Sequence, residues 1–362
     1  MGVVIGSIAR STPEPSSDRS SPSTFSLTPA SATSAAPTTA APPVMVARPR
    51  TDPRDFHAGM SLVIYGNTSD LGRKAGPLLD RLADLRVNSL SVTFPLYQRS
   101  WTASAVEADP ATTPSPENLE SLVRSAHQRR FTVMLRPIID EQALIGDGQW
   151  RGSIRPVNVG AWFESYTRLA LLYATFAQRE AVEIFCVATE LVSLEQQEQE
   201  WISLIAQVRS VFHGQVTYCA NWDSFARAPF WNAVDFVGID GFFPLSAPAS
   251  ATTEQLAVAW QPWVRRIEEF KRIVDKPIVL TEQGVTSQEG SHRQPWLWDQ
   301  KTPIDVETQS RYYRATCDAM AKLVSGLYWW AVNLELPNTG TVDGGYSPLG
   351  KPAESEVRRC FS

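Results

Sequence analysis

The chain has 362 residues, 43% of them hydrophobic, and carries a net charge of -5 with an isoelectric point near 5.5. This length is enough for a large core, and an acidic balance without a basic patch argues against nucleic acid or an anionic membrane as the main partner. The 12 Trp and 15 Phe predict a core rich in aromatic side chains, with some indoles left to stack against sugar rings.

The first 52 residues predict a disordered segment or linker. Residues 11–50 contain 30 Pro, Ser, Thr or Ala, and such a tract cannot bury enough apolar surface to offset the entropy of ordering it. The preceding nine residues, MGVVIGSIA, are apolar but too short to span a membrane. A Ser/Thr/Pro-rich stalk ahead of one folded domain leads us to expect an extracellular or cell-surface-tethered protein, without a complete signal peptide in view.

From residue 53 to residue 362, apolar runs alternate with segments of helical periodicity. Eight runs have the length and composition of buried strands. They cover residues 59–66, 88–97, 131–139, 182–190, 214–222, 235–245, 276–284 and 325–333.

The segments between these runs predict amphipathic helices, apart from a short fifth connection at 225–234. The helices are expected over residues 75–86, 116–130, 161–180, 198–212, 253–275, 305–324 and 353–361. When each strand leads into a helix, the strands pair in parallel and the helices cover the outside of the sheet. Eight such units over about 300 residues predict an α/β fold of the (β/α)8 TIM barrel type, as a single domain. A doubly wound open sheet is the alternative, but the first turn, YGNTSDLG, matches GxGxxG poorly.

Two glutamates stand at the carboxyl ends of predicted strands, where a barrel of this kind carries its functional groups. Glu190 ends the fourth run, and Glu282 ends the seventh, in KPIVLTEQG. Either residue alone could be a helix cap or half of an ion pair. As a pair they suit glycoside hydrolysis, because one carboxyl can protonate the leaving oxygen while the other attacks the anomeric carbon.

Other polar and aromatic side chains at the same strand ends are candidates for binding a sugar. They are Arg136, Asp140, Trp150, Asn221, Trp222, Asp240, Phe242 and Trp330. Arg136 could instead neutralise Asp140 or Glu141, and Asp240 could instead cap a loop.

The cysteines and histidines do not predict a metal site. The four Cys form no CxxC pair and the four His are scattered. No cofactor is expected either, because two carboxylates supply both the proton transfers and the nucleophile. Cys317 and Cys360 fall on helices that should be neighbours, so an exported protein could join them in a disulfide, whereas Cys186 and Cys219 are expected to be buried thiols.

Several stretches of the chain resemble glycoside hydrolase family 113, the β-mannanase family within the retaining clan of (β/α)8 glycosidases. They are TPSPENLESLVRSAHQRRFTVMLRPIID (113–140), WRGSI (150–154), ATELVSLEQQEQEWISLIAQVRSVF (188–212), TYCANWD (217–223), FWNAVDFVGIDGFFPLS (230–246), PIVLTEQG (277–284), YYRA (312–315), LYWWA (327–331) and GYSPLGKPA (345–353). The resemblance covers nearly all of residues 57–362. It implies a retaining endo-β-1,4-mannanase-like activity with Glu190 as acid/base and Glu282 as nucleophile, and it places Asn221, Trp222 and Trp330 in the sugar-binding cleft.

Three segments depart from the family pattern. Glu190 is preceded by Ala-Thr where the family reads Gly-Thr. The sixth strand reads DGFFP where the family tends to read Asp-Ala-Tyr-Phe-Pro, so Phe242 replaces a Tyr whose hydroxyl would be expected to contact the nucleophile. The third strand reads RPIID in place of a Lys-Pro-His-Val-Asp-like run.

We therefore expect retaining hydrolysis of a β-linked polysaccharide, with mannan or glucomannan as the leading substrate and no obligatory protein partner. A non-catalytic carbohydrate-binding barrel and a hydrolase of another β-glycan are the alternatives.

Overall fold

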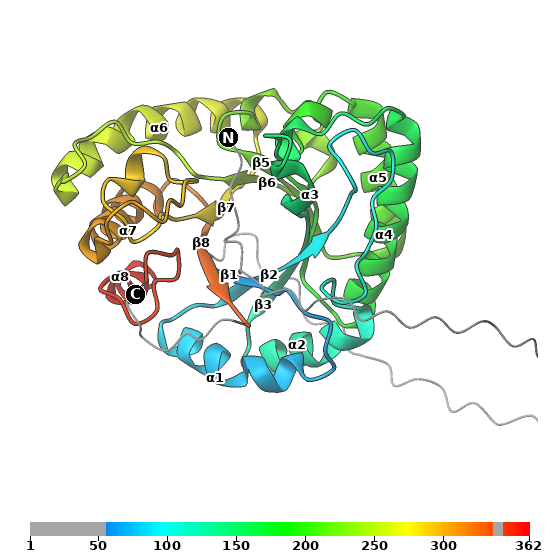
Figure 1. The fold of residues 1–362 in the computed structure, drawn as a ribbon, viewed down its shortest axis with the longest axis horizontal. Coiled ribbons are helices and arrows are strands. Elements are labelled where there is room, and N and C mark those ends of the chain that lie inside the picture. Colours follow the sequence, from blue (N-terminus) through cyan, green and yellow to red (C-terminus); the bar gives the residue numbers. More distant parts are fainter. Residues whose placement is uncertain (1–55, 336–342) are drawn as a thin grey trace, which may run out of the picture. The chain divides into compact units, whose positions relative to one another are not determined.

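The structure is a computed structural model that describes residues 56–335 and 343–362. These residues form a closed barrel in which eight parallel strands pair in sequence order and β8 returns to β1 (Figure 1). The strands are β1 His57–Val63, β2 Ser89–Leu96, β3 Thr132–Ile139, β4 Ile184–Thr189, β5 Gln215–Asn221, β6 Phe236–Asp240, β7 Ile278–Gln283 and β8 Gly326–Asn333. The (β/α)8 prediction is confirmed, and the open-sheet alternative is wrong. The predicted N-terminal segment, residues 1–52, lies outside the described residues.

Helices surround the ring of strands in Figure 1. They are α1 Leu71–Asp84, α2 Pro116–Gln128, α3 Gln142–Ile145, α4 Val159–Arg179, α5 Glu198–Val211, α6 Thr253–Val274, α7 Val306–Met320 and α8 Ala353–Cys360. The short connection between β5 and β6 holds only two 3-10 turns, Phe225–Arg227 and Trp231–Ala233. Helix α3 was not predicted, because four residues are too few to show a helical period.

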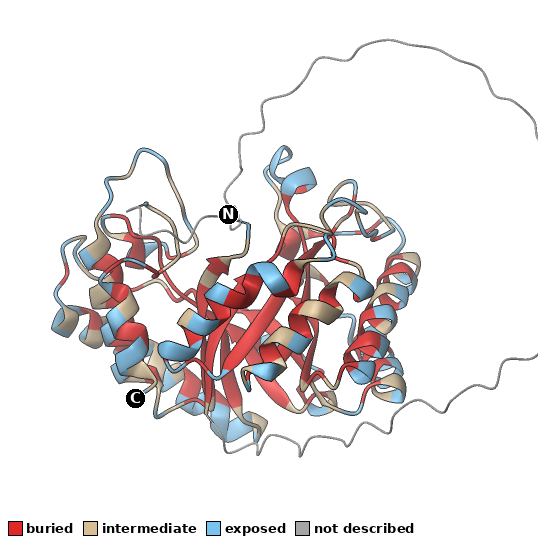
Figure 2. Cartoon of the chain, turned by 90° about the horizontal axis from the view of Figure 1, so that it is seen from below, coloured by how far each residue is buried: buried red, intermediate tan, exposed pale blue. Residues whose placement is uncertain are grey.

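Helix α6 illustrates how the sequence produces these elements. Thr252 and Gln255 form a capping box at its start, where each side chain accepts from the backbone N–H of the other. Its buried residues, Leu256, Trp260, Ile267 and Phe270, recur at helical spacing. One face therefore packs on the barrel, and in Figure 2 the helices carry exposed residues on their outer side while the strands are buried.

The inside of the barrel is filled by side chains from six strands. A separate cluster of buried side chains comprises Met134, Ile184, Cys186, Cys219, Phe236, Val279 and Tyr328. Strand side chains alternate between the two faces of a sheet. Arg136, two residues beyond Met134, therefore points into the same interior but closer to the carboxyl end of its strand.

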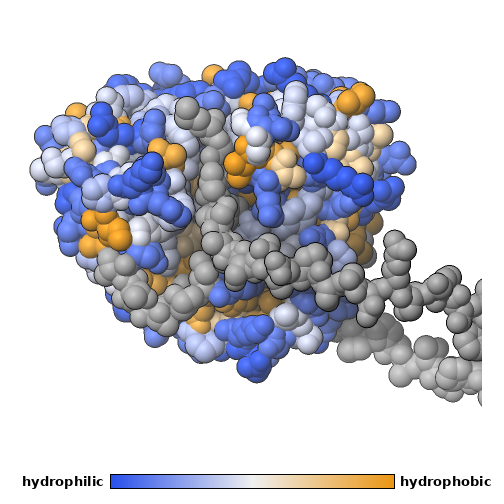
Figure 3. Space-filling view, in the orientation of Figure 1, coloured by the Kyte–Doolittle hydropathy of each residue, from blue (hydrophilic) through white to orange (hydrophobic). Residues whose placement is uncertain are grey.

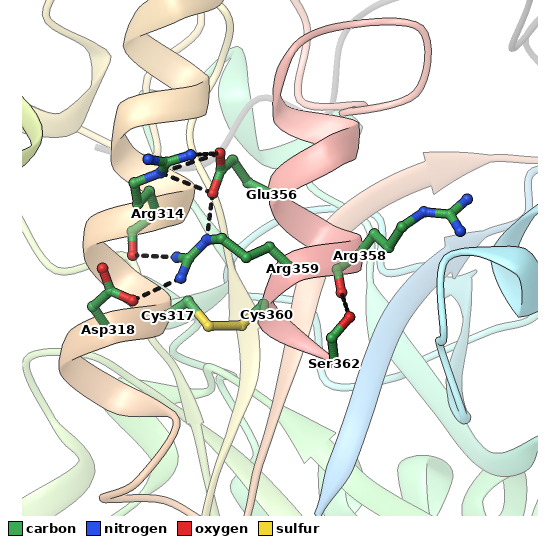
Figure 4. The surroundings of a disulfide bond; sticks show 8 residues. All are labelled: Arg314, Cys317, Asp318, Glu356, Arg358, Arg359, Cys360 and Ser362. Carbon is green, nitrogen blue, oxygen red and sulfur yellow. Dashed lines mark hydrogen bonds and ion pairs between the residues drawn. A yellow bond between two sulfur atoms is a disulfide. The ribbon is translucent and has the colours of Figure 1, made fainter.

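A disulfide joins the last two helices of the chain. Cys317 on α7 and Cys360 on α8 are bonded, and Arg314, Glu356 and Arg359 form a hydrogen-bonded network beside them (Figure 4). The predicted pairing is confirmed. Cys186 and Cys219 are buried free thiols, as predicted.

Helix length and surface hydropathy can be assessed over the part of the chain that the structure describes. Among the described residues, no helix has both the length and the apolar composition needed to cross a bilayer. On the face shown in Figure 3, hydrophilic side chains predominate and hydrophobic ones form small separate groups.

Candidate active site

Irregular strand pairing brings Glu282 to the inside of the barrel. The register between β6 and β7 shifts after Ile239, so that Asp240 pairs with Glu282. The register between β7 and β8 shifts over the same stretch of β7. A bulge interrupts the alternation of side chains and re-aims the residue that follows it. Glu282 can therefore face the same interior as Asp240 and is only 3% exposed.

Arg136 lies between the carboxylates of Asp240 and Glu282. One nitrogen, Nη2, is 2.7 Å from Asp240 Oδ2 and 2.6 Å from Glu282 Oε1. Its Nε donates to Thr189 Oγ1 at 3.0 Å and its Nη1 donates to the carbonyl of Thr281 at 3.2 Å. The guanidinium is fully buried, so Arg136 contacts the two carboxylates from the barrel interior and does not face the solvent. The alternative that Arg136 neutralises Asp140 or Glu141 is wrong.

Burial and charge together set the protonation of this group. Burial raises the pKa of Asp240 to about 7, although the charge of Arg136 opposes the shift. Burial also raises the pKa of Glu282, with Arg136 again opposing and the charges of Asp240 and Glu190 adding to the rise. Two carboxyls that share one guanidinium titrate as a pair, and the second proton is the harder one to remove. The site therefore readily holds one proton near neutral pH.

Glu190 sits on the turn that follows β4. Its backbone is left-handed, with φ of 52°, a conformation that a residue other than glycine adopts only where its surroundings enforce it. Its N–H donates to the carbonyl of Cys219 on β5 at 2.8 Å. Its Oε2 accepts from Arg151 Nη1 at 2.7 Å, and the carboxyl is 2% exposed.

Arg151 links Glu190 to a further buried acid. Its backbone N–H donates to Glu141 Oε1 at 3.2 Å, and its Nη2 is 3.3 Å from the same oxygen. Its Nε donates to the carbonyl of Ile139 at 2.9 Å. Burial raises the pKa of Glu141 to about 7 against the charge of Arg151. Each of the two predicted catalytic carboxylates is thus in contact with its own buried arginine.

An aromatic wall stands beside the two carboxylates. Buried Phe242 and Trp330 pack with Val63, and Tyr65, Trp222, Trp296 and Tyr346 lie against them. The Trp222 and Trp296 rings stack with their centroids 5.5 Å apart and an angle of 8° between planes. The Phe242 ring meets Tyr346 edge-on at 6.3 Å. Three predicted residues, Trp222, Phe242 and Trp330, therefore belong to one surface.

The remaining predicted residues lie around this centre. Asp140 accepts from the Tyr65 hydroxyl at 2.9 Å and from the N–H of Gln142 at 2.8 Å. Asn221 ends β5 and donates to Asp223 Oδ1 at 2.8 Å. Trp150 is half-buried on the β3–α4 connection, and its ring covers Gly152 so closely that a Cβ there would lie 2.3 Å from it. The absence of a side chain at residue 152 therefore leaves room for the Trp150 ring.

Sequence reasoning gave no role to Arg151, Trp296 or Tyr346. Arg151 follows the predicted Trp150 and carried a weak signal, as a charge beside an aromatic residue after a strand. Trp296 lies in the long β7–α7 loop, which has no periodicity to read. Tyr346 precedes α8 and donates its hydroxyl to the carbonyl of Pro295, which ties its segment to the loop of Trp296.

The described residues show no metal centre. No group of three His, Cys, Asp or Glu side chains in the ranges 56–335 and 343–362 is arranged to hold a metal ion. The chemical groups present at the barrel mouth are carboxylates, guanidiniums and aromatic rings. They can donate and accept protons and can stack on an apolar sugar face.

A closed (β/α)8 barrel with two buried glutamates at the ends of β4 and β7, beside a wall of indoles, has the features of a barrel glycosidase. The chain belongs to Glycoside Hydrolase Family 113, whose family model matches residues 67–351. It is a glycoside hydrolase similar to β-mannanases. No protein of curated function matches it significantly in sequence.

Solved structures with the same fold include members of this family. The family 113 β-mannanase of Alicyclobacillus acidocaldarius, in complex with ManMIm, is 29% identical with a TM-score of 0.76, over 85% of this chain and 97% of that chain. A family 113 β-1,4-mannanase is 24% identical with a TM-score of 0.76, over 85% and 99% of the two chains. A family 5 mannosidase from Rhizomucor miehei shares the fold at 13% identity, with a TM-score of 0.55 over 85% and 92%.

Proposed function

We propose that this protein hydrolyses β-1,4-linked mannan with retention of anomeric configuration, using Glu282 as the nucleophile and Glu190 as the acid/base. The observation that carries the proposal is the pair of buried carboxylates, Glu190 just after β4 and Glu282 on β7, each in contact with its own arginine. Two carboxyl groups in one barrel mouth are what the double-displacement reaction requires. The similarity to β-mannanases supports mannan over other β-glycans.

In the first step, Glu282 attacks the anomeric carbon while Glu190 gives its proton to the leaving oxygen. Arg136 stabilises the ionised form of Glu282 by direct contact. The attack requires that the proton of the Asp240–Glu282 pair resides on Asp240 at that moment, so that Glu282 is ionised. Thr281 Oγ1 donates to Asp240 Oδ1 at 2.8 Å and fixes the position of that carboxyl.

In the second step, Glu190 removes a proton from water, which attacks the glycosyl-enzyme and releases Glu282. This change of role needs a carboxyl that stays in one place while it loses and regains its proton. Arg151 holds Oε2 of Glu190 from one side and leaves Oε1 for the proton transfer. The aromatic wall stacks on the apolar face of the sugar, with Trp222 and Trp296 offering the half-buried indoles.

Hydrolysis assays on matched variants test the proposal. Glu282→Ala should abolish hydrolysis of mannan, glucomannan, xylan and cellulose oligomers alike. Glu190→Ala should spare the first step for substrates with activated leaving groups, and added azide should rescue the second by attacking the glycosyl-enzyme. Wild-type preference for another β-glycan would replace mannan as the substrate. Binding of manno-oligosaccharides without any turnover would favour a carbohydrate-binding barrel.

We also propose that the folded domain works in an oxidising compartment outside the cytoplasm. The Cys317–Cys360 disulfide supports this, because disulfides form and persist in secreted proteins and are rare in the cytosol. Thiol counting on the protein recovered from culture medium and from cells would test it. Recovery of the active protein only from the cytoplasmic fraction, with four free thiols, would contradict it.

A further inference from the structure

The turn that carries Glu190 is held by contacts at several of its residues. After the left-handed Glu190 comes Leu191, which is fully buried. The N–H of Leu191 has no strand partner and donates to the hydroxyl oxygen of Tyr218, at 3.0 Å. A buried N–H without a partner is costly, so this hydrogen bond helps to fix the direction in which the chain leaves Glu190.

Tyr218 is itself rigidly placed. It stands on β5, next to β4, and its ring packs against Trp201, Phe230 and Trp231 at centroid distances of 5.4, 5.2 and 6.0 Å. The hydroxyl oxygen accepts a hydrogen bond from Leu191, so the hydroxyl hydrogen is free to point in another direction. The hydroxyl donates to Glu195 Oε1 at 3.1 Å.

Glu195 is a buried acid outside the contacts described so far. It is 1% exposed and lies five residues beyond Glu190, just after the 3-10 turn Val192–Leu194. Its Oε1 accepts from Tyr218 and, at 2.8 Å, from the hydroxyl of Ser224 on the β5–β6 connection. No ion pair of the described residues includes Glu195. The carboxyl therefore acts here as an acceptor for two hydroxyls.

We propose that Glu195 and Tyr218 are positioning residues for the acid/base Glu190. Glu195 orients the Tyr218 hydroxyl, the hydroxyl oxygen holds the N–H of Leu191, and this hydrogen bond keeps Glu190 in its left-handed conformation with its carboxyl aimed at the leaving oxygen. Neither Glu195 nor Tyr218 needs to touch the substrate. The inference rests on the proposed function, since it assumes that Glu190 is the proton donor.

The readout is the dependence of kcat/KM on the leaving group. Mannopentaose has a poor leaving group that needs the proton of Glu190. A 2,4-dinitrophenyl β-mannobioside has a leaving group that departs as a stable phenolate and does not need that proton. A misplaced Glu190 carboxyl should therefore lower kcat/KM on mannopentaose and leave kcat/KM on the dinitrophenyl substrate unchanged. General damage to the barrel lowers kcat/KM on both substrates.

Three variants carry the test. Glu195→Ala and Tyr218→Phe should lower kcat/KM on mannopentaose by about tenfold to a hundredfold, as expected for a misplaced catalytic group. Both should stay within about threefold of the wild type on the dinitrophenyl substrate. Glu195→Gln keeps an acceptor oxygen and should restore most of the activity on mannopentaose. Tyr173→Phe, which removes a buried hydroxyl that donates to the carbonyl of Pro114, is the matched control and should behave as the wild type.

The proposal is overturned if Glu195→Ala and Tyr218→Phe retain wild-type activity on mannopentaose, or if both substrates slow equally. If Glu195→Ala does not fold, Tyr218→Phe and Ser224→Ala carry the same comparison, with a smaller loss expected for Ser224→Ala. Glu190→Ala, measured alongside, separates the two claims. If that variant shows no preference for the activated substrate, the proposed role of Glu190 fails, whatever the Glu195 variants do.

Discussion

Replacing Arg136 by Met should both destabilise the protein and inactivate it. The substitution removes the guanidinium that contacts Asp240 and Glu282 at 2.7 and 2.6 Å, and all three side chains are buried. Breaking a buried pair by removing one partner costs about 3–5 kcal/mol, because a buried charge is left uncompensated. At roughly 2 °C per kcal/mol for a domain of this size, the Tm should fall by roughly 6–10 °C.

The loss of activity follows from the same contact. A neighbouring guanidinium lowers the pKa of a carboxyl by about 1–3 units, so its removal should lower the ratio of ionised to protonated Glu282 by roughly tenfold to a thousandfold at a given pH. The kcat/KM on mannopentaose should fall by about that factor near pH 6 and recover in part as the pH rises, because alkali ionises the carboxyl again. Arg136→Lys keeps the charge but loses the planar geometry, and should lie between the wild type and the Met variant.

Thermal unfolding and a pH series of kcat/KM on the three proteins decide the matter. An Arg136→Met protein whose Tm stays within about 1 °C of the wild type would refute the energetic argument. A loss of activity that does not shrink toward alkaline pH would refute the electrostatic one.

Three further predictions concern the hydroxyl missing from the sixth strand, the disulfide and the pH dependence of stability. Phe242→Tyr should speed turnover by about tenfold if the new hydroxyl reaches Glu282, since such a bond is worth roughly 1.5–3 kcal/mol. A slower enzyme with a lower Tm would mean that the hydroxyl is buried without a partner. Replacing Cys317 and Cys360 by Ser should cost about 2–4 kcal/mol of unfolding free energy, and the unreduced wild type should show two free thiols under denaturing conditions, not four. Burial raises the pKa of Asp240 and Glu195 to about 7, so the folded state keeps protons that the unfolded state loses near pH 4. The unfolding free energy should therefore fall as the pH rises from about 4 to 7, by up to about 1.4 kcal/mol per pH unit for each group, and level off above pH 7. Denaturant titrations across that range check the slope, which Glu195→Gln should flatten and which a rising stability would contradict.

The order of strands and helices could be read from the sequence because each element has its own apolar pattern. Helix α5 was predicted at 198–212 and is Glu198–Val211. The prediction for the sixth strand, residues 235–245, is too long, because the strand ends at Asp240. Beyond it, Gly241, Phe242, Phe243 and Leu245 are buried, so this segment has the apolar pattern of a strand although it does not pair as one.

The sequence predicts those site residues whose position follows from a single strand. Glu190 and Glu282 follow apolar runs, and the position of a strand end in a barrel is enough to select them. The pairings of Arg136 with Glu282 and of Arg151 with Glu190 join residues far apart in the chain. The first also depends on a shift of register between β6 and β7 that no apolar pattern records. Glu195 lies in the run EQQEQE, which reads as a solvated helix start, yet it is buried.

The most direct test of the central claim is to trap the glycosyl-enzyme. A 2-deoxy-2-fluoro-β-mannoside with an activated leaving group slows both steps, and the good leaving group lets the first step proceed so that the intermediate accumulates. Mass spectrometry of the labelled protein should find one sugar, attached to the peptide that contains Glu282, and Glu282→Ala should take up none. A label on Glu190 or on any other residue, or a wild-type enzyme that turns over mannan but releases a product of inverted anomeric configuration, would contradict the mechanism.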